Sequence, residues 1–290
     1  MISEYIHNME VIGSTGPWVV LDSITKLASA HRGRVVIAGS HGGTYAGYCA
    51  ARGGVRAVIF NDAGVGRDAA GIAALPYLQQ WGVAAAAVDY RSARIGDGAD
   101  MARNGVISYV NALAAALGCV AGQTVAECAA QLCAAPLASA TPAEAYESRL
   151  LLPVPQGGSA IGLDSVSLLE PGDTGAIAVT ASHGEMLAST GSDGVGPAVF
   201  MVSFSDAGLG KDGAGASRLG SLQARGIAGL TVSAYSARIG SARSCYEDGV
   251  ISCANARARE LGARPGTPIK PFIDALATGR HNRQEQEKNG

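Results

Sequence analysis

The sequence predicts an α/β protein built as a tandem, pseudo-twofold repeat of βαβαβα units, whose mostly parallel strands form doubly wound, Rossmann-like sheets. Two observations predict this fold. Residues 60–118 can be laid on residues 204–262 without a gap, and 28 of the 59 positions are then identical. Within each copy, short apolar runs alternate with longer helix-like stretches, which is typical of parallel strands joined by crossover helices.

Four short apolar runs in the first copy are expected to form strands. They cover residues 18–21, 34–38, 55–60 and 83–88. Helix-like stretches follow the last three, at residues 45–52, 68–81 and 100–117. The matching strands of the second copy are residues 176–180, 198–204 and 227–232. Asn111 and Asn255 fall inside the last helix of each copy and are expected to bond loop backbone.

Capping signals mark the segments between and after the copies. Thr124 and Thr141 are each followed three residues later by glutamate, and each of these capping boxes predicts a short helix. Thr267 followed by proline predicts a helix at the end of the second copy. The expected organisation is a first repeat (1–132), a connecting helix and linker (133–157), a second repeat (158–276) and a polar, disordered tail (277–290).

The composition excludes several classes of function. The net charge of −2 gives no sign of polyanion binding, so nucleic acid is not an expected partner. The first residues lack the features of a secretory signal, and no apolar run reaches the roughly 18 residues of a membrane span. We therefore expect a cytoplasmic protein with no membrane contact. The low share of charged residues, 16%, is compatible with a homo-oligomer. The six cysteines lack metal-site spacing and are expected to be buried or partly buried free thiols.

Polar residues that recur in both copies follow the expected strands, where ligands bind in doubly wound sheets. The first motif is Ser-His-Gly. A histidine at a strand end, followed by glycines, has an exposed imidazole and nearby backbone N–H groups that can contact an anion. We expect these histidines to act as general acid or base or as oxyanion donors, and the alternative is that each only holds a neighbouring loop. The candidates from this motif are Ser40, His41, Gly42, Gly43, His183 and Glu185.

The second motif is Asp-Ala-Gly-x-Gly. Asp62 and Asp206 are candidates to orient a histidine or to act as a base, and the alternative is a cap for the following helix. Asp68 and Asp212 stand near the start of that helix and are expected to cap it.

The third motif is Ser-Ala-Arg-Ile-Gly. The guanidinium groups of Arg94 and Arg238 suit a carboxylate, so we expect both to bind substrate. Ser92 is a candidate nucleophile, and Ser236 is a candidate hydrogen-bond donor to the substrate. The alternative for Arg94 is an ion pair with Asp62 of its own copy.

The two copies differ in charge around the expected site. The first copy has Asp89, Asp97 and Asp100 at positions where the second has serine. This difference predicts an asymmetric pocket in which the first copy is the chemical half.

Strands that end in Ser-His-Gly and then Asp-Ala-Gly are locally similar to the caspase-type peptidases. That family places its cysteine nucleophile after the second strand, where this chain has Ala63 and Gly64, so peptidase activity is not expected. The chain contains no Walker A, GxSxG or HExxH motif, and no dinucleotide fingerprint. No cofactor is therefore expected.

Together these features predict a small-molecule enzyme with its site between the two repeats. The expected reaction is cofactor-independent hydrolysis of a small amide, lactam or ester that bears a carboxylate or similar anionic group. A histidine assisted by an aspartate moves the proton, and Ser40, Ser92 or a water is the nucleophile. The alternatives are a proton-transfer isomerase or lyase, a non-catalytic binding protein for a small anionic metabolite, and a metal site formed by both histidines and an aspartate.

Overall fold

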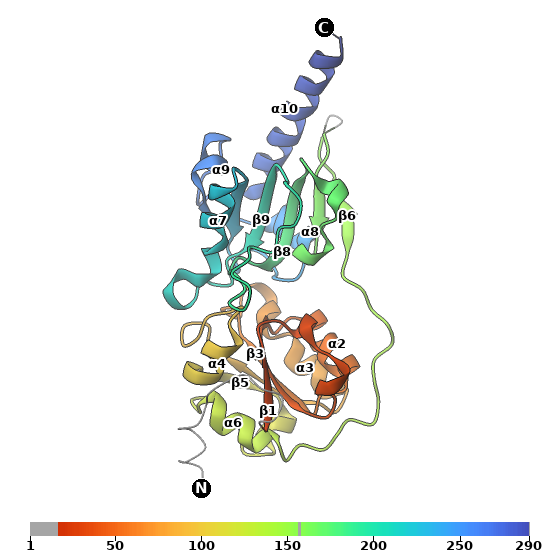
Figure 1. The fold of residues 1–290 in the computed structure, drawn as a ribbon, viewed down its shortest axis with the longest axis vertical. Coiled ribbons are helices and arrows are strands. Elements are labelled where there is room, and N and C mark those ends of the chain that lie inside the picture. The colour runs from red at the N-terminus through yellow and green to blue at the C-terminus, as the bar shows by residue number, and fades with distance from the viewer. Residues whose placement is uncertain (1–16, 156–157, 290) are drawn as a thin grey trace.

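The computed structural model describes residues 17–155 and 158–289, which form an α/β protein with two mostly parallel sheets (Figure 1). A first unit, residues 17–132, holds a five-stranded sheet, and a second unit, residues 149–289, holds a six-stranded sheet. Figure 1 shows the second unit above the first, with residues 133–148 running between them along one side. The expected α/β fold with mostly parallel strands is confirmed.

The first sheet has the strand order β1-β2-β3-β4-β5, in which only the last pairing is antiparallel. Its strands are β1 (Trp18–Leu21), β2 (Val35–His41), β3 (Ala57–Asn61), β4 (Ala84–Val88) and β5 (Ile107–Val110). The α-helices of this unit are α2 (Thr44–Gly53), α3 (Ala74–Gln80), α4 (Gly98–Asn104), α5 (Ala112–Ala115) and α6 (Val125–Leu132). Its 3₁₀ helices are η1 (Ile24–Lys26), η2 (Ser29–His31) and η3 (Arg67–Ile72).

Both faces of the first sheet are covered. Val36 and Val58 pack with α2 and α3 on one face, whereas Val35 and Ile37 pack with α4 and α6 on the other. The strands are therefore apolar almost throughout, and all five residues of β4 are buried. Because four of those five residues are alanine, the helices pack close to the sheet.

The second sheet has the strand order β11-β10-β9-β8-β7-β6, in which both outermost pairings are antiparallel. Its strands are β6 (Arg149–Leu151), β7 (Ile161–Leu163), β8 (Ile177–His183), β9 (Met201–Ser205), β10 (Ala228–Val232) and β11 (Ile251–Ala254). The α-helices are α7 (Arg218–Ala224), α8 (Ala242–Asp248), α9 (Ala256–Glu260) and α10 (Ile269–Asn289). The 3₁₀ helices are η4 (Val166–Leu168), η5 (Pro171–Asp173) and η6 (Lys211–Ala216).

The connection from β8 to β9 differs from its counterpart in the first unit. Helix α2 connects β2 to β3, but residues 184–200, between β8 and β9, contain no helix. Val195 and Val199 of this segment pack on one face of the second sheet beside Leu219 and Leu222 of α7. The segment therefore covers sheet surface that a helix covers in the first unit.

The parallel strands of each sheet follow chain order without a reversal. Neither sheet therefore contains the reversal point of a doubly wound sheet, at which a ligand was expected. The pseudo-twofold tandem repeat remains a prediction.

The expected helix over residues 100–117 is wrong. Helix α4 ends at Asn104, strand β5 follows, and α5 begins at Ala112. A four-residue edge strand is too short for its alternation to stand out from a helical pattern. Asn111 is the N-cap of α5, and Asn255 is the N-cap of α9, so neither lies inside a helix.

The capping signals had mixed outcomes. The box at Thr124 begins α6, and α10 begins directly after Thr267-Pro268, as expected. Residues 133–148 form neither helix nor strand, so the helix expected after Thr141 is wrong. A capping box stabilises a helix only weakly, and most of residues 139–149 are exposed, with no apolar face to bury.

The polar segment that was expected to be disordered is helical as far as Asn289. Helix α10 continues through it and projects beyond the second unit (Figure 1). Arg280 anchors this part of the helix, since its guanidinium lies 3.9 Å from the centre of the Phe200 ring and donates to the Gly175 carbonyl at 3.1 Å.

All six cysteines are free thiols and are buried or half-buried, as expected. Within residues 17–155 and 158–289, no helix combines the length and the apolar character that a membrane span needs.

Candidate functional site

The two units meet through the loops that follow β3 and β9. A Cβ built on Gly64 would lie only 3.2 Å from Cα of Gly208, so the two backbones touch. The backbone N–H of Arg67 donates to the Ala234 carbonyl at 2.8 Å, and that of Lys211 donates to the Tyr90 carbonyl at 2.9 Å. The carboxyl ends of the strands in one sheet therefore face those of the other sheet.

This contact requires an uncommon backbone conformation. Ala63, Val65 and Asp68 have φ of 49°, 63° and 54°, in the left-handed region that non-glycine residues seldom adopt. Ala207 and Leu209 of the second unit have φ of 47° and 66°. A small apolar cluster, formed by Ala63, Ile95, Ala207 and Ile239, lies between the loops. Packing between the units therefore holds a strained backbone in place.

Asp62 and Asp206 stabilise these loops. Oδ1 of Asp62 accepts hydrogen bonds from the backbone N–H groups of Gly64 and Tyr90, each at 3.0 Å. Oδ1 of Asp206 accepts from Gly208 at 2.9 Å and Ala234 at 2.8 Å. Both side chains are buried, and burial raises the pKa of Asp62. Within the described part of the chain, neither carboxylate is hydrogen-bonded to a histidine.

Arg94 and Arg238 form ion pairs between the units. Arg94 pairs with Asp212, and Arg238 pairs with Asp68 at 2.9 Å. The alternative for Arg94, an ion pair with Asp62 of its own copy, is therefore wrong, because its partner Asp212 belongs to the other unit. Asp68 and Asp212 do not cap helices, since η3 and η6 have glycine N-caps without side-chain cap bonds.

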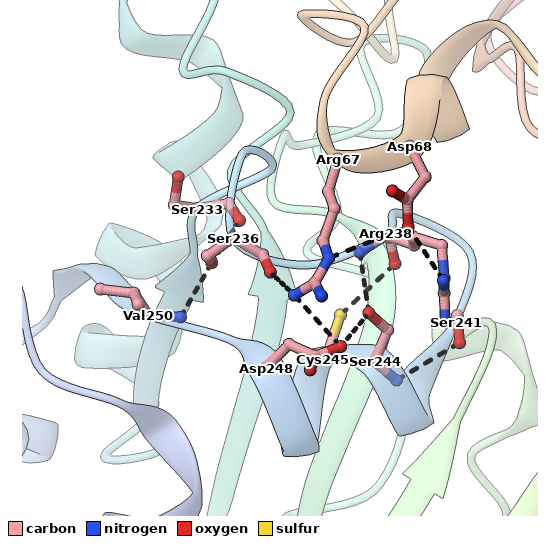
Figure 2. A network of polar contacts seen from close by, with 10 residues as sticks. All are labelled: Arg67, Asp68, Ser233, Ser236, Arg238, Ser241, Ser244, Cys245, Asp248 and Val250. Atoms are coloured by element: carbon pink, nitrogen blue, oxygen red, sulfur yellow. Dashed lines mark hydrogen bonds and ion pairs between the residues drawn. The ribbon is translucent and has the colours of Figure 1, made fainter.

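A wider polar network surrounds the Arg238–Asp68 pair (Figure 2). Arg67 donates to the Ser236 carbonyl at 2.7 Å and lies 3.3 Å from the Asp248 carboxylate. The opposite contact joins Lys211 to Asp100 at 2.8 Å. The second unit thus keeps a carboxylate at this contact, at position 248 instead of 244.

One pocket of about 500 Å³ lies between the units. The segment between the units contributes Ala145, Tyr146 and Glu147 to its lining. Three tyrosines, Tyr45, Tyr48 and Tyr77, line the wall formed by the first unit. Five of the residues predicted from the sequence also line it, namely Ser40, His41, Gly43, His183 and Arg238.

His41 stands at the end of β2 and is half-buried. Its Nδ1 accepts a hydrogen bond from the backbone N–H of Gly43 at 3.1 Å, so in the neutral ring the proton is on Nε2. Burial lowers the pKa of His41 to about 4, and the ring is therefore neutral at pH 7. A Cβ at Gly43 would lie 2.6 Å from this Nδ1, and one at Gly42 would lie 2.7 Å from the Gly71 carbonyl oxygen, which explains both glycines.

His183 occupies the same place at the end of β8. It is buried, and a Cβ on Gly96 of the first unit would lie 3.0 Å from its Cε1. Likewise, a Cβ on Gly240 of the second unit would lie 3.4 Å from Cε1 of His41. Burial lowers the pKa of His183 well below its usual value, with smaller effects from Arg218 and His41. The structure therefore brings two neutral imidazoles to one pocket, each beside a glycine of the other unit.

The serines predicted to take part in chemistry bond nearby backbone. Oγ of Ser40 accepts from the Ile24 N–H at 2.9 Å. Oγ of Ser92 donates to the Asp89 carbonyl at 2.7 Å and accepts from Val106 at 3.0 Å. Ser236 makes the same two contacts in the second unit, at 2.8 and 2.9 Å. Ser92 and Ser236 thus fix the loops that carry Arg94 and Arg238.

Sequence reasoning missed Glu147, which belongs to the segment taken as a connecting linker. Burial raises its pKa to about 7, and the nearby charge of Asp164 adds to this effect. No local pattern marks this residue, since only the path of residues 133–148 brings it to the pocket. The aromatic wall could have been predicted in part from the sequence. Tyr45 and Tyr48 stand only three residues apart in a chain with few aromatic residues, and their rings are in contact.

The other seven residues predicted from the sequence do not line this pocket. They are Asp62, Asp206, Arg94, Ser92, Ser236, Gly42 and Glu185. Within the described ranges, no three His, Cys, Asp or Glu side chains are grouped so that they could hold a metal ion.

Comparisons with protein-family models, with curated proteins and with solved structures found no match for this chain.

Proposed function

We propose that the pocket between the units is the active site of a cofactor-independent hydrolase for a small amide, lactam or ester that bears a carboxylate. One observation carries the proposal: three complementary groups line the same pocket. His41 is a neutral imidazole, Glu147 is a carboxyl group with a pKa of about 7, and Arg238 is a partly exposed guanidinium. They supply an oxyanion donor, a base and a substrate anchor.

His41 acts as a donor and not as the base. Its Nδ1 is occupied by the Gly43 N–H, and its Nε2 carries the proton. A neutral imidazole N–H can polarise a carbonyl group and stabilise the oxyanion that forms when the carbonyl is attacked.

Glu147 is the proposed base. In its ionised form it takes a proton from a water molecule while the water oxygen bonds to the carbonyl carbon of the substrate. The protonated carboxyl then gives this proton to the leaving nitrogen or oxygen as the C–N or C–O bond breaks, so the net reaction consumes one water. Water is the nucleophile in this scheme, since Oγ of Ser40 accepts from the Ile24 N–H and donates its own proton to Oγ of Ser23.

Arg238 binds the anionic group of the substrate. Asp68 contacts only Nη1, and a guanidinium carries five N–H donors, so a substrate carboxylate can bind its other edge. The tyrosine wall offers a flat apolar surface for the remainder of the substrate.

The test is a screen of the full chain against small amides, lactams and esters with a carboxylate, with release of the acid as the readout. For a substrate that is turned over, Glu147→Gln should lower kcat by about 10²–10⁴. His41→Phe should lower kcat by about 10²–10³. Arg238→Met should mainly raise KM, because it removes binding and not chemistry.

Matched controls lie close to each of these residues in the chain. Glu144→Gln changes an exposed carboxyl group in the same segment, and His31→Phe changes a histidine outside the pocket. Arg243→Met removes an exposed guanidinium from α8. All three should keep the kcat and KM of the unaltered chain. Full turnover by both Glu147→Gln and His41→Phe would exclude the proposed mechanism.

A proton-transfer isomerase or lyase is the second candidate. The observation that favours it is again that a neutral His41 and an ionisable Glu147 line the same pocket, because such a pair can also remove a proton next to a carbonyl group. Incubation in D₂O separates the two: proton transfer puts deuterium on carbon, whereas hydrolysis in H₂¹⁸O puts ¹⁸O into the acid. A ligand that binds but is never converted would support the non-catalytic binding protein.

We also infer that the two units arose by duplication and are related by a pseudo-twofold axis. The reciprocal contacts of Arg94 and Arg238, and of His41 and His183, support this relation. The cytoplasmic location and the homo-oligomer expected from the sequence remain predictions.

A further inference from the structure

A second group of polar side chains lies in the second unit, behind His183. It consists of His183 at the end of β8, Glu185 two residues later, and Arg218 at the start of α7. Arg218 is only 2% exposed, and Glu185 only 6%. Nε of Arg218 donates to the Glu185 carbonyl at 2.7 Å, which holds the two residues together.

Each of the three side chains has a buried polar atom without a hydrogen-bond partner. These atoms are Nη1 of Arg218, Oε2 of Glu185 and Nδ1 of His183. Buried polar atoms are nearly always paired, and a buried charge needs a partner even more. Three unpaired atoms in adjacent residues therefore indicate that a partner is missing.

Among the described residues, no carboxylate forms an ion pair or side-chain hydrogen bond with Arg218. Burial lowers its pKa to about 10, which still leaves it charged at pH 7. Oδ1 of Asp193, the nearby carboxylate, accepts from Arg225 at 2.7 Å, and its Oδ2 accepts from Ser221 at 2.7 Å. Burial raises the pKa of Glu185 to about 8, so this group is mostly uncharged at pH 7.

All three unpaired atoms can act as donors in these protonation states. The guanidinium only donates, an uncharged carboxyl group donates one O–H, and a neutral imidazole can carry its proton on Nδ1. We propose that Arg218, Glu185 and His183 form a covered site for a small oxyanion, such as a carboxylate or inorganic phosphate. This site goes beyond the proposed hydrolytic pocket, with which it shares only His183.

The segment 186–199 covers this site. A Cβ on Gly194 would lie 3.3 Å from Nη1 of Arg218, so the segment passes directly over the guanidinium. Contacts with the first unit hold the segment down: the Ser189 N–H donates to Asp22 at 2.7 Å, and that of Ala188 donates to the Gly96 carbonyl at 3.3 Å.

The first unit lacks the side chains for such a site. The positions that correspond to Glu185 and Arg218 are Gly43 and Ala74. The covered anion site therefore belongs to the second unit alone.

Thermal unfolding of the full chain tests the proposal. Sodium formate and sodium phosphate, each titrated at constant ionic strength against sodium chloride, should raise Tm at pH 7 with saturation, because a ligand that binds the folded state stabilises it. Arg218→Met should weaken the apparent affinity at least about tenfold. Arg243→Met, which removes an exposed guanidinium from α8 of the same unit, is the control, and it should keep the full response.

The pH dependence supplies a second, independent test that does not require Arg218 to be changed. Arg94, Asp97, Asp100 and Arg218 are the charged groups that act on Glu185. Anion binding to the unaltered chain should decline as the pH rises through about 8, because Glu185 then becomes negative. Glu185→Gln should bind at pH 7 and should not show this decline, since the amide remains a neutral donor.

Two results would overturn the proposal. One is a chain whose Tm responds to formate and phosphate no more than to chloride, which would mean that internal water alone fills the site. The other is a response that is unchanged in Arg218→Met or, if that variant does not fold, a decline in Glu185→Gln identical to that of the unaltered chain.

Discussion

Lys211 of the second unit donates to both carboxylate oxygens of Asp100 in the first unit, at 2.8 and 3.1 Å. The opposite contact joins Arg67 to Asp248, which lies four residues, or one helical turn, beyond the position that corresponds to Asp100. Arg67, which is longer than Lys211, thus reaches the more distant carboxylate of Asp248. The interface keeps a charge pair on both sides although the residues differ, which indicates that this pairing helps to hold the units together.

Asp100→Ser should destabilise the protein by about 2–4 kcal/mol in urea unfolding, because Asp100 is buried and its loss leaves Lys211 unpaired. Asp248→Asn should cost about 0.5–1 kcal/mol, since that pair is about a third exposed on both sides. Equal losses in the two variants would contradict this explanation.

Moving the carboxylate should rescue the first variant. The triple change Asp100→Ser, Asn104→Asp and Lys211→Arg reproduces the arrangement of the second unit, in which Ser244 bonds Asp248 and an arginine reaches it. We expect about half or more of the lost free energy of unfolding to return. A triple variant no more stable than Asp100→Ser would show that side-chain reach does not matter.

Gly64→Ala should destabilise the protein by about 2–4 kcal/mol, because it adds a methyl group 3.2 Å from Gly208 at a residue with φ of 74°. Gly82→Ala is a close control, with φ of 73° and no atom within 4 Å of the added Cβ. That control should cost only about 1 kcal/mol, the strain of the left-handed backbone. If chemical denaturation gives the same loss of unfolding free energy for both variants, the close approach of the loops does not contribute to the effect of Gly64→Ala.

Asn111→Ala should cost about 2–3 kcal/mol. Oδ1 of Asn111 caps α5 by accepting from Ala114 and also accepts from Ala85, while its Nδ2 donates to the Val83 carbonyl at 2.9 Å. The side chain is buried, so its loss leaves these backbone groups unpaired. Asn255 makes corresponding bonds in the second unit, and the same substitution there should have a similar effect on Tm.

Stability should fall as the pH drops from 6.5 to 4. The pKa of His41 is about 4 in the folded protein and near the ordinary 6.5 in the unfolded chain. Between these values the unfolded chain binds a proton that the folded protein does not, so acid favours unfolding. His41→Gln should reduce the slope of the free energy of unfolding against pH in this window, and His31→Gln, outside the pocket, should leave it unchanged. An identical slope in His41→Gln would show that this residue does not contribute.

Much of the fold could be predicted because its strands and helix starts are marked by local sequence patterns. The apolar runs gave seven of the strands close to their observed positions, and Thr124 with Glu127 marked the start of α6. The edge strand at residues 107–110 was missed because four residues fit a helical pattern equally well. The strand order could not be predicted from the sequence, since strand pairing depends on contacts between segments that are distant in the chain.

The candidate site was predictable only in part. His41, His183 and Arg238 stand out because their motifs recur, and all three line the pocket. The same recurrence also marked Asp62 and Ser92, whose side chains form hydrogen bonds with loop backbone. The recurrence of a residue does not show whether it stabilises a loop or binds a ligand.

The sequence by itself determined the α/β class and the ends of strands as the places where recurring polar motifs gather, because these follow from period and local propensity. Only the tertiary structure decided that two separate sheets face each other, that Glu147 lines the pocket, and that Nη1 of the buried Arg218 has no hydrogen-bond partner. These features arise from contacts between residues far apart in the chain. Burial, and with it each pKa and each unpaired atom, exists only once those segments have packed together.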